Sequence, residues 1–230
     1  MEEQEVTAEA QISHLESILG KKAPDCGIIQ SSFHPVLPAP AFMNPAERIA
    51  MNMERYYMNP WQMIEDKIIY TNDEVDMLNP VKNFPNEKWL HAITDQWLTE
   101  RLFALYKSRR MVITWLMVFL HLWLCMFREG AAVFFVSDKE EKSDKLVKRA
   151  QFIFEHIPDD MILKPKAKPS YCYLEFPGLN SYIQGVPQGA NQLRQEGATA
   201  LLFDEFAFWL EARPTFMASK PTIDGGGKLT

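Results

Sequence analysis

The chain has 230 residues, of which 47% are hydrophobic and 12% aromatic, so it carries enough apolar side chains for a sizeable core. Lys and Arg number 24 and Asp and Glu number 30, which gives a formal net charge of −6. This acidic balance argues against a protein that holds nucleic acid mainly through bulk positive charge, although a local basic patch could still contact phosphate.

The cysteines and the N-terminus indicate a cytoplasmic protein. Cys26, Cys125 and Cys172 are too few and too widely spaced for a disulfide framework or a metal-binding pair. The N-terminus, MEEQEVTAEAQ, is acidic and lacks the basic start and apolar core of an export signal. We therefore expect the chain to fold in a reducing cytoplasm.

The first part of the chain is predicted to be helical. A short helix around residues 7–19 is followed by a proline-containing linker. Asn44 and Pro45 then stand in the order expected of an N-cap and a first helical residue, which predicts a helix over 45–58. We expect residues 1–78 to form a helical N-terminal segment with a linker.

From Asn79 onward the pattern changes to short apolar runs that alternate with amphipathic stretches, which indicates an α/β fold with a mainly parallel sheet between helices. This second region is expected to extend over residues 79–230. Strands are predicted at 102–106, 131–136, 171–176, 181–186 and 200–203, with the opening of another in the last three residues. Helices are predicted at 87–99, at 111–127, and after a capping box formed by Ser137 and Glu140.

Residues 111–127 form the most apolar segment, in which only Thr114 and His121 are polar. Its length lies between that of a buried core helix and that of a membrane span of about 20 residues. Because the segments on either side are predicted to be strands of one sheet, which a bilayer could not divide, the core helix is favoured over the membrane span.

The run ALLFDE at 200–205 is the strongest local motif. Four apolar residues predict a buried strand, and Asp204 and Glu205 follow at its carboxyl end, where open α/β sheets bind ligands. In ATP-hydrolysing folds the first such acid holds Mg²⁺ and the second polarises the attacking water. The alternative is a pair of strand-end acids with a structural role.

A phosphate-binding loop is expected upstream, between a strand and the start of a helix. Residues 102–115, LFALYKSRRMVITW, have this order, with Thr114 at the start of the helix. The GxxxxGK[ST] pattern is not met, because Val112 and Ile113 stand where the glycine and lysine would be. The alternative is a basic loop that caps a strand. The loop residues in question are Lys107, Ser108, Arg109 and Arg110.

Several segments together resemble one family. KSRRMVITW at 107–115, GVPQGANQLRQEGATALLFDEFAFW at 185–209 and KPTIDGGGKLT at 220–230 are similar, in order and rough spacing, to the ATPase part of a tailed-phage terminase large subunit. The similarity extends upstream through NPVKNFPNEKWL at 79–90. The resemblance implies a P-loop ATPase-type fold with ATP and Mg²⁺ as cofactors. It also implies that ATP hydrolysis drives double-stranded DNA into a procapsid in the host cytoplasm.

The resemblance also implies residue roles. The loop of Lys107, Ser108, Arg109 and Arg110 would bind phosphate, with Lys107, Arg109 or Arg110 as its cation. Thr114 and Asp204 would hold Mg²⁺, and Glu205 would orient water. Arg194 would reach the nucleotide of a neighbouring subunit in a homo-oligomeric ring, and the adenine side would be formed by Phe84, Pro85 and Trp89. Portal protein and small terminase subunit are the implied partners.

Two departures from the family pattern leave an alternative open. Val112 and Ile113 replace the flexible glycine and the lysine of the phosphate loop, and the nuclease domain that would follow the ATPase part is expected to be absent. After Glu205 the only acids are Glu211 and Asp224, so no nuclease activity is expected. The rival interpretation is a non-catalytic fragment that keeps the fold as a nucleotide-binding or interaction module.

Overall fold

The computed structural model describes residues 44–107, 111–189 and 197–230, so the helix expected at 7–19 lies outside the described residues. The helices are α2 (Pro45–Met58), α3 (Trp61–Glu65), α4 (Lys88–Thr99), α5 (Ile113–Phe127), α6 (Glu140–His156) and α7 (Ala212–Asp224), with 3-10 turns η1 (Pro177–Leu179) and η2 (Phe206–Phe208). The strands are β1 (Tyr70–Asn72), β2 (Val81–Asn83), β3 (Ala132–Ser137), β4 (Lys168–Ser170), β5 (Tyr173–Phe176), β6 (Ser181–Pro187), β7 (Ala200–Phe203) and β8 (Lys228–Leu229).

The main sheet has six strands in the order β4-β5-β6-β3-β7-β8. Strands β6, β3, β7 and β8 are parallel to one another, and β5 and β4 extend the sheet beyond β6 by antiparallel pairing. In the centre, Val133 of β3 lies opposite Ile183 of β6 and Ala200 of β7. The predicted α/β fold with a mainly parallel sheet is therefore confirmed.

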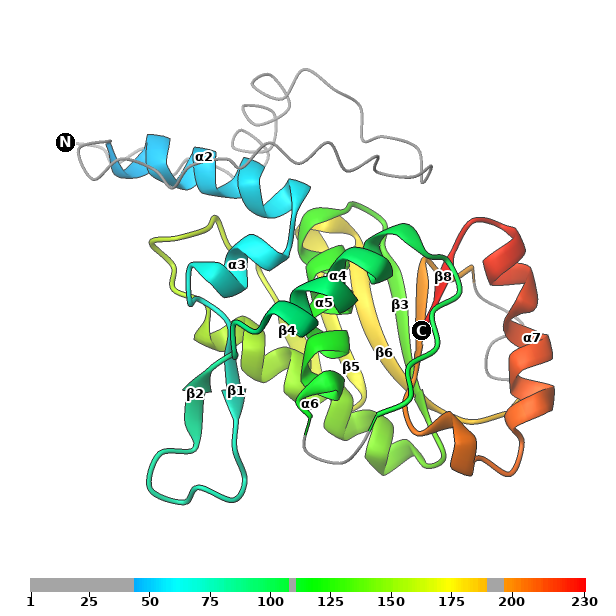
Figure 1. Cartoon of the computed structure of the whole chain (residues 1–230). Helices are drawn as coiled ribbons and strands as arrows, with labels where there is room; N and C mark the ends of the chain where they lie inside the picture. The colour runs from blue at the N-terminus through cyan, green and yellow to red at the C-terminus, as the bar shows by residue number, and fades with distance from the viewer. Residues whose placement is uncertain (1–43, 108–110, 190–196) are drawn as a thin grey trace.

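Helices cover both faces of this sheet (Figure 1). Alternate residues of β3 explain why: Val133 and Phe135 belong to a large cluster with α5 and α6, whereas Phe134 and Val136 belong to a smaller cluster beneath η2 and α7. Side chains of a strand alternate between the two faces of its sheet, so an entirely apolar strand requires cover on both. The result is a three-layer domain.

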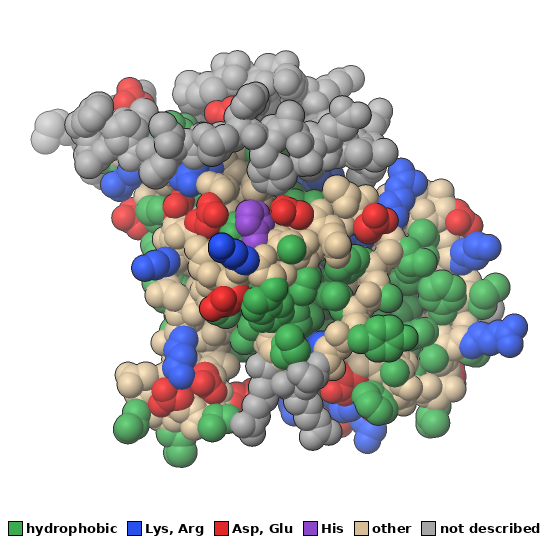
Figure 2. All heavy atoms as spheres, in the orientation of Figure 1, with side chains coloured by type: hydrophobic (Ala, Val, Ile, Leu, Met, Phe, Trp, Pro, Cys, Tyr) green, Lys and Arg blue, Asp and Glu red, His purple; other side chains and the backbone are tan. Residues whose placement is uncertain are grey.

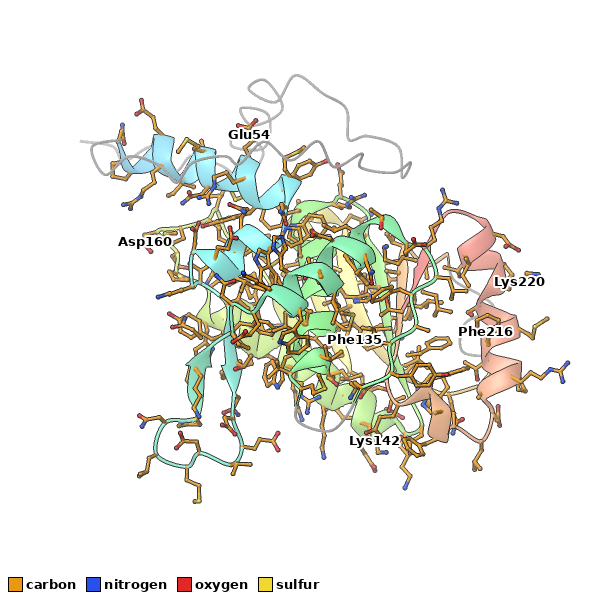
Figure 3. All side chains as sticks on the ribbon, in the orientation of Figure 1. Glu54, Phe135, Lys142, Asp160, Phe216 and Lys220 are labelled. Carbon is orange, nitrogen blue, oxygen red and sulfur yellow. The ribbon has the colours of Figure 1, made fainter. Side chains whose placement is uncertain are left out.

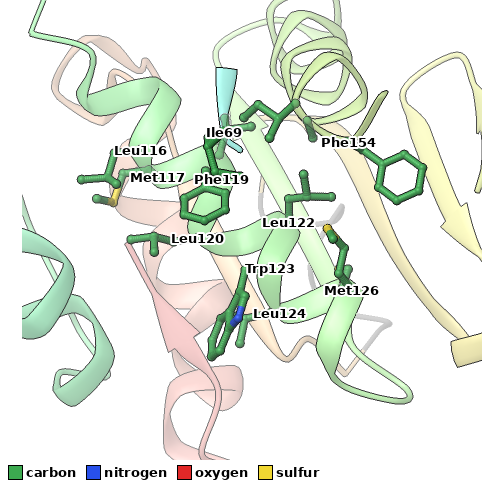
Figure 4. Packing of buried hydrophobic residues seen from close by; sticks show 14 of the residues in the cluster. Ile69, Leu116, Met117, Phe119, Leu120, Leu122, Trp123, Leu124, Met126 and Phe154 are labelled. Carbon is green, nitrogen blue, oxygen red and sulfur yellow. The ribbon is translucent and has the colours of Figure 1, made fainter. Parts of the chain in front are cut away.

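Helix α5 is the centre of the larger cluster. Of its fifteen residues, all but Thr114, Trp115 and Phe127 are buried. Figure 4 shows α5 side chains packed among residues of the same cluster, including Ile69 and Phe154. The interpretation of this segment as a core helix is confirmed. None of the helices in the described ranges has the length and apolar character needed to cross a membrane.

Helix α6 is held unusually close to the sheet. A Cβ atom on Gly185 of β6 would lie only 3.0 Å from the backbone carbon of Ser143 on α6, so a side chain there would force the two elements apart. The Ser143 hydroxyl donates a hydrogen bond to the carbonyl of Val186 at 2.6 Å. This contact fixes where the side chains of α6 lie relative to α5 and the sheet.

The first described helices pack onto the same core. Asn44 caps α2 as predicted, because its side-chain oxygen accepts a hydrogen bond from the amide of Ala46 at 3.1 Å. Tyr56 of α2 and Trp61 of α3 belong to the large cluster. The division expected between residues 78 and 79 falls inside the hairpin of β1 and β2, which projects from the body of the protein in Figure 1.

Two predictions of local structure are wrong. Residues 102–106 form no strand but a single bridge, Leu102 to Leu229, and Tyr106 is fully exposed. The bridge ends quickly because β8 is only two residues long and offers little backbone to pair with. The capping box also fails: Ser137 ends β3 and its hydroxyl donates to Asp138, while Lys139 occupies the N-cap without a side-chain hydrogen bond.

The buried histidine of α5 makes stability depend on pH. Burial lowers the pKa of the His121 imidazole to about 4, from about 6.5 in an unfolded chain. Between these pH values His121 is protonated in the unfolded chain but stays neutral in the folded protein. The free energy of unfolding should therefore fall as pH drops from about 6.5 to 4, by up to about 3 kcal/mol.

Urea unfolding at several pH values measures this dependence. Replacing His121→Gln should flatten the slope in that window relative to the parent protein, whatever its effect on stability at pH 7. His91→Gln, which changes a half-exposed histidine beside Asp95, serves as the matched control. Equal slopes for the parent and the His121 variant would contradict the assignment.

Candidate functional site

The candidate site lies at the carboxyl ends of the central parallel strands, where the predicted acids follow β7. The amide of Asp204 donates to the carbonyl of Val136 in β3 at 3.0 Å, which extends the β3–β7 pairing by one residue and fixes the backbone of the acid. The indole of Trp209 donates to the carbonyl of Asp204 at 3.0 Å. Asp204 is therefore held from both sides by the backbone and the following turn.

The start of α5 meets this strand end. Thr114, in the first turn of the helix, donates a hydrogen bond from its hydroxyl to Oδ1 of Asp204 at 3.4 Å. The two residues are 90 positions apart in sequence. A hydroxyl and a carboxylate are oxygen ligands of the kind that Mg²⁺ prefers, so the pair fits the donor set of a metal–nucleotide site.

Burial raises the pKa of the Asp204 carboxyl above its ordinary value, and the neighbouring Glu205 raises it further. The nearby cations Lys107 and Arg149 and the hydrogen bond from Thr114 act in the opposite direction. A partly desolvated carboxylate of this kind gains from a cation that replaces its lost water. Among the described residues, no three His, Cys, Asp or Glu side chains converge on a common point where they could hold a metal ion.

Glu205 lies in a strained turn and is engaged by a lysine. Its backbone is left-handed, with φ at 56°, and its side chain is about half exposed. Lys142, in the first turns of α6, lies 3.6 Å from the Glu205 carboxylate and 2.9 Å from that of Asp138. Lys142 is labelled at the end of the sheet in Figure 3. The second acid of the motif is thus paired in this structure rather than free.

Val112 is the N-cap residue of α5 and has φ at 50°. This left-handed conformation is the one in which glycine is normally found, and a β-branched side chain there costs on the order of 1–2 kcal/mol. No side-chain hydrogen bond caps the helix. The backbone at residue 112 therefore has a conformation typical of glycine, although the side chain is that of valine.

A cavity of about 630 Å³ opens beside the start of α5. It lies between the β1–β2 hairpin, the residues that lead into α5, and α6. Its walls are formed by Thr71, Asn72, Asp73, Glu74, Val75, Lys82, Asn83, Pro85, Lys107, Met111, Val112, Ile113, Thr114, Trp115 and Arg149. Asp204 is not one of the lining residues, but its carboxylate accepts a hydrogen bond from Thr114, which is.

The structure brings some predicted site residues together and separates others. Lys107, Thr114 and Pro85 line the cavity. Phe84 is buried in the large cluster, and Trp89 is 40% exposed at the start of α4 without lining the cavity. The remaining predicted residues, Ser108, Arg109, Arg110 and Arg194, lie outside the described residues.

Sequence reasoning missed Arg149, which the cavity brings next to Thr114 and Lys107. On α6 it lies three residues after the buried Leu146 and one before the buried Ala150, so the helical pattern already placed it at the border of the packed face. Only the packing of α6 against α5 determines that this border faces the cavity. The hairpin wall was missed as well, because two three-residue strands give a weak pattern.

Comparison with known proteins identifies the fold. No family model and no curated protein sequence matches the chain. Among solved structures, the HK97 bacteriophage large terminase matches with a TM-score of 0.54 and 12% identity, covering 73% of this chain and 36% of that one. The ATPase domain of the Thermus phage P74-26 large terminase matches in two crystal structures, one of which is of a mutant. Both matches have a TM-score of 0.45 and cover 64% of this chain. The sequence identity is 11% for the mutant and 12% for the other structure.

The described residues thus define an α/β protein with a mainly parallel sheet and a candidate site at its carboxyl edge. The particular fold is similar to that of part of the HK97 large terminase. The resemblance expected from the sequence is confirmed for the fold. The matched part of this chain covers 36% of the HK97 structure, about a third of its length. It covers 64% and 63% of the two P74-26 domain structures, just under two thirds.

The raised pKa of Asp204 predicts a conflict between stability and ligand binding. The Asp204 carboxyl has a higher pKa in the folded protein than in the unfolded chain, so folding favours its protonated form. This contribution to stability is present below the unfolded pKa and is lost as pH rises through the folded pKa. At pH 7 the ionised Asp204 therefore destabilises the ligand-free protein. Asp204→Asn should therefore raise the melting temperature of the ligand-free protein by a few degrees, with the gain vanishing at acidic pH. Thermal unfolding at pH 7.5 and pH 3.5 tests this, and a lower melting temperature at pH 7.5 would refute it.

Proposed function

We propose that this chain is the ATPase module of a phage DNA-packaging motor, binding ATP with Mg²⁺ in the cavity beside α5 and hydrolysing it. The observation that carries the proposal is the contact between Thr114 and Asp204 at the carboxyl ends of a parallel sheet. Similarity of the fold to the HK97 large terminase supports it. Translocation of double-stranded DNA, assembly into a homo-oligomeric ring, and contacts with portal protein and small terminase subunit belong to the same proposal.

Each described site residue has a chemical task in this proposal. Asp204 and the Thr114 hydroxyl would hold Mg²⁺, which neutralises charge on the phosphates. The exposed ammonium group of Lys107, at the cavity wall, would offset the remaining phosphate charge. Glu205 would orient and polarise the attacking water, for which it must leave Lys142. The hairpin wall would exclude bulk water from one side of the nucleotide.

A second candidate is a nucleotide-binding module without turnover. The pairing of Glu205 with Lys142 favours it, because a carboxylate engaged by an ammonium group is a poor partner for water. Val112 at the left-handed N-cap favours it as well, because a β-branched residue stands where the resemblance implies a flexible glycine. Both candidates share the binding step and differ only in hydrolysis.

Glu205→Gln separates the two candidates. The change removes the charge that polarises water and leaves Asp204 and Thr114 intact, so Mg²⁺-dependent ATP affinity should stay within about threefold while the hydrolysis rate falls by about 10²-fold or more. Titration calorimetry measures affinity and phosphate release measures turnover.

Glu211→Gln is the matched control, because Glu211 is another exposed carboxylate in the segment that follows β7. It should leave both quantities unchanged. Equal loss of affinity and turnover in the Glu205 variant would contradict its assigned role, and ATP binding without turnover in the parent protein would establish the second candidate.

A further inference from the structure

Arg149 is a cation on the cavity wall. It lies in the middle of α6 and is half-buried. Among the described residues no carboxylate oxygen lies within ion-pair distance of its guanidinium group, in contrast to the neighbouring Lys148, which contacts Asp144 at 2.7 Å. We propose that Arg149 binds the terminal phosphate of the nucleotide and supplies the charge that Ile113 cannot. This inference rests on the proposed function.

The position of Arg149 is fixed by an aromatic side chain next to Thr114. Its guanidinium carbon lies 5.5 Å from the ring centroid of Trp115. Trp115 in turn packs edge-on against Phe152, at 5.7 Å between centroids. A guanidinium group stacked on an indole loses little further freedom when it binds an anion, because its plane is already oriented. Trp115 follows Thr114 directly, so the cation is kept near the start of α5.

A second cation reaches the same cavity from another element. Lys107, before α5, and Arg149, on α6, both line the cavity together with Thr114. The Thr114 hydroxyl in turn contacts the Asp204 carboxylate at 3.4 Å. The terminal phosphate of a nucleotide shares its metal ion with such a carboxylate, so two cations on this part of the wall suit a phosphate bound there.

The other charges on the cavity do not neutralise Arg149. Asp73 and Glu74 belong to the β1–β2 hairpin, and Asp73 is bound by Lys82 at 2.9 Å. Lys107 adds a second positive charge near Thr114. The end of the cavity beside α5 is therefore positive and the hairpin end is not, which suits a ligand with its charge concentrated at one end, as in a nucleoside triphosphate.

The alternative role for Arg149 is to cover Trp115, with no ligand contact. Arg149→Met distinguishes the two roles, because methionine keeps an unbranched stem over the indole and removes only the charge. Loss of a charge-assisted phosphate contact should weaken Mg²⁺-dependent ATP binding by about 10- to 100-fold. Binding of ADP, which lacks the terminal phosphate, should change by less than about threefold. Titration calorimetry with ATP and with ADP measures both.

Lys145→Met is the matched control: Lys145 is exposed, lies one turn earlier on α6 and does not line the cavity, so both affinities should match the parent. Unchanged ATP affinity in the Arg149 variant, or equal loss of ATP and ADP, overturns the inference while leaving the proposed function in place. If the parent protein binds neither nucleotide with Mg²⁺, the proposed function fails and the inference falls with it.

Arg149→Lys keeps the test decisive if the methionine variant does not fold. Lysine retains the charge but not the planar two-donor group that matches phosphate geometry. We expect a loss of several-fold in ATP affinity with ADP unchanged, and an unchanged preference for ATP over ADP would count against a direct phosphate contact.

Discussion

The burial of α5 on all sides is the constraint on which the rest of the structure depends. A helix with almost no polar face can be stable in water only if other elements enclose it, and here the sheet, α4 and α6 do so. The enclosure fixes the first turn of the helix against the end of β7. The contact between Thr114 and Asp204 is thus a consequence of core packing.

Much of the fold could be predicted from the sequence because the relevant signals are local. The N-cap at Asn44, the apolar run of β3 and the acid pair after β7 each depend on a few neighbouring residues. Helix α7 was not predicted, since its buried positions include Thr215 and Ser219, whose hydroxyl groups satisfy backbone carbonyls instead of forming an apolar stripe. The predicted strand at 102–106 failed because pairing depends on a partner strand far away in sequence.

The candidate site was predictable in part for the same reason. Asp204 and Thr114 stand at recognisable positions relative to a strand and a helix, whereas Arg149 reaches the cavity through the packing of α6 against α5 and the sheet. The engagement of Glu205 by Lys142 likewise joins two elements that no local pattern relates. The features that favour ligands also oppose stability: a desolvated acid at 204 and a left-handed valine at 112 each raise the energy of the ligand-free protein.

The unequal clusters on the two faces of the sheet have a dynamic consequence. Helix α7 covers the smaller cluster and contains Pro221 in its interior. Met217 of α7 and Phe208 of the preceding η2 are exposed. Figure 2 shows hydrophobic side chains at the surface on the side of the molecule where α7 lies. Local opening costs less where fewer apolar contacts must be broken, so amide hydrogens of α7 should exchange with solvent sooner than those of α5. Glu205 directly precedes η2 on this side of the sheet, so we expect its turn to lie next to the part of the protein that exchanges sooner.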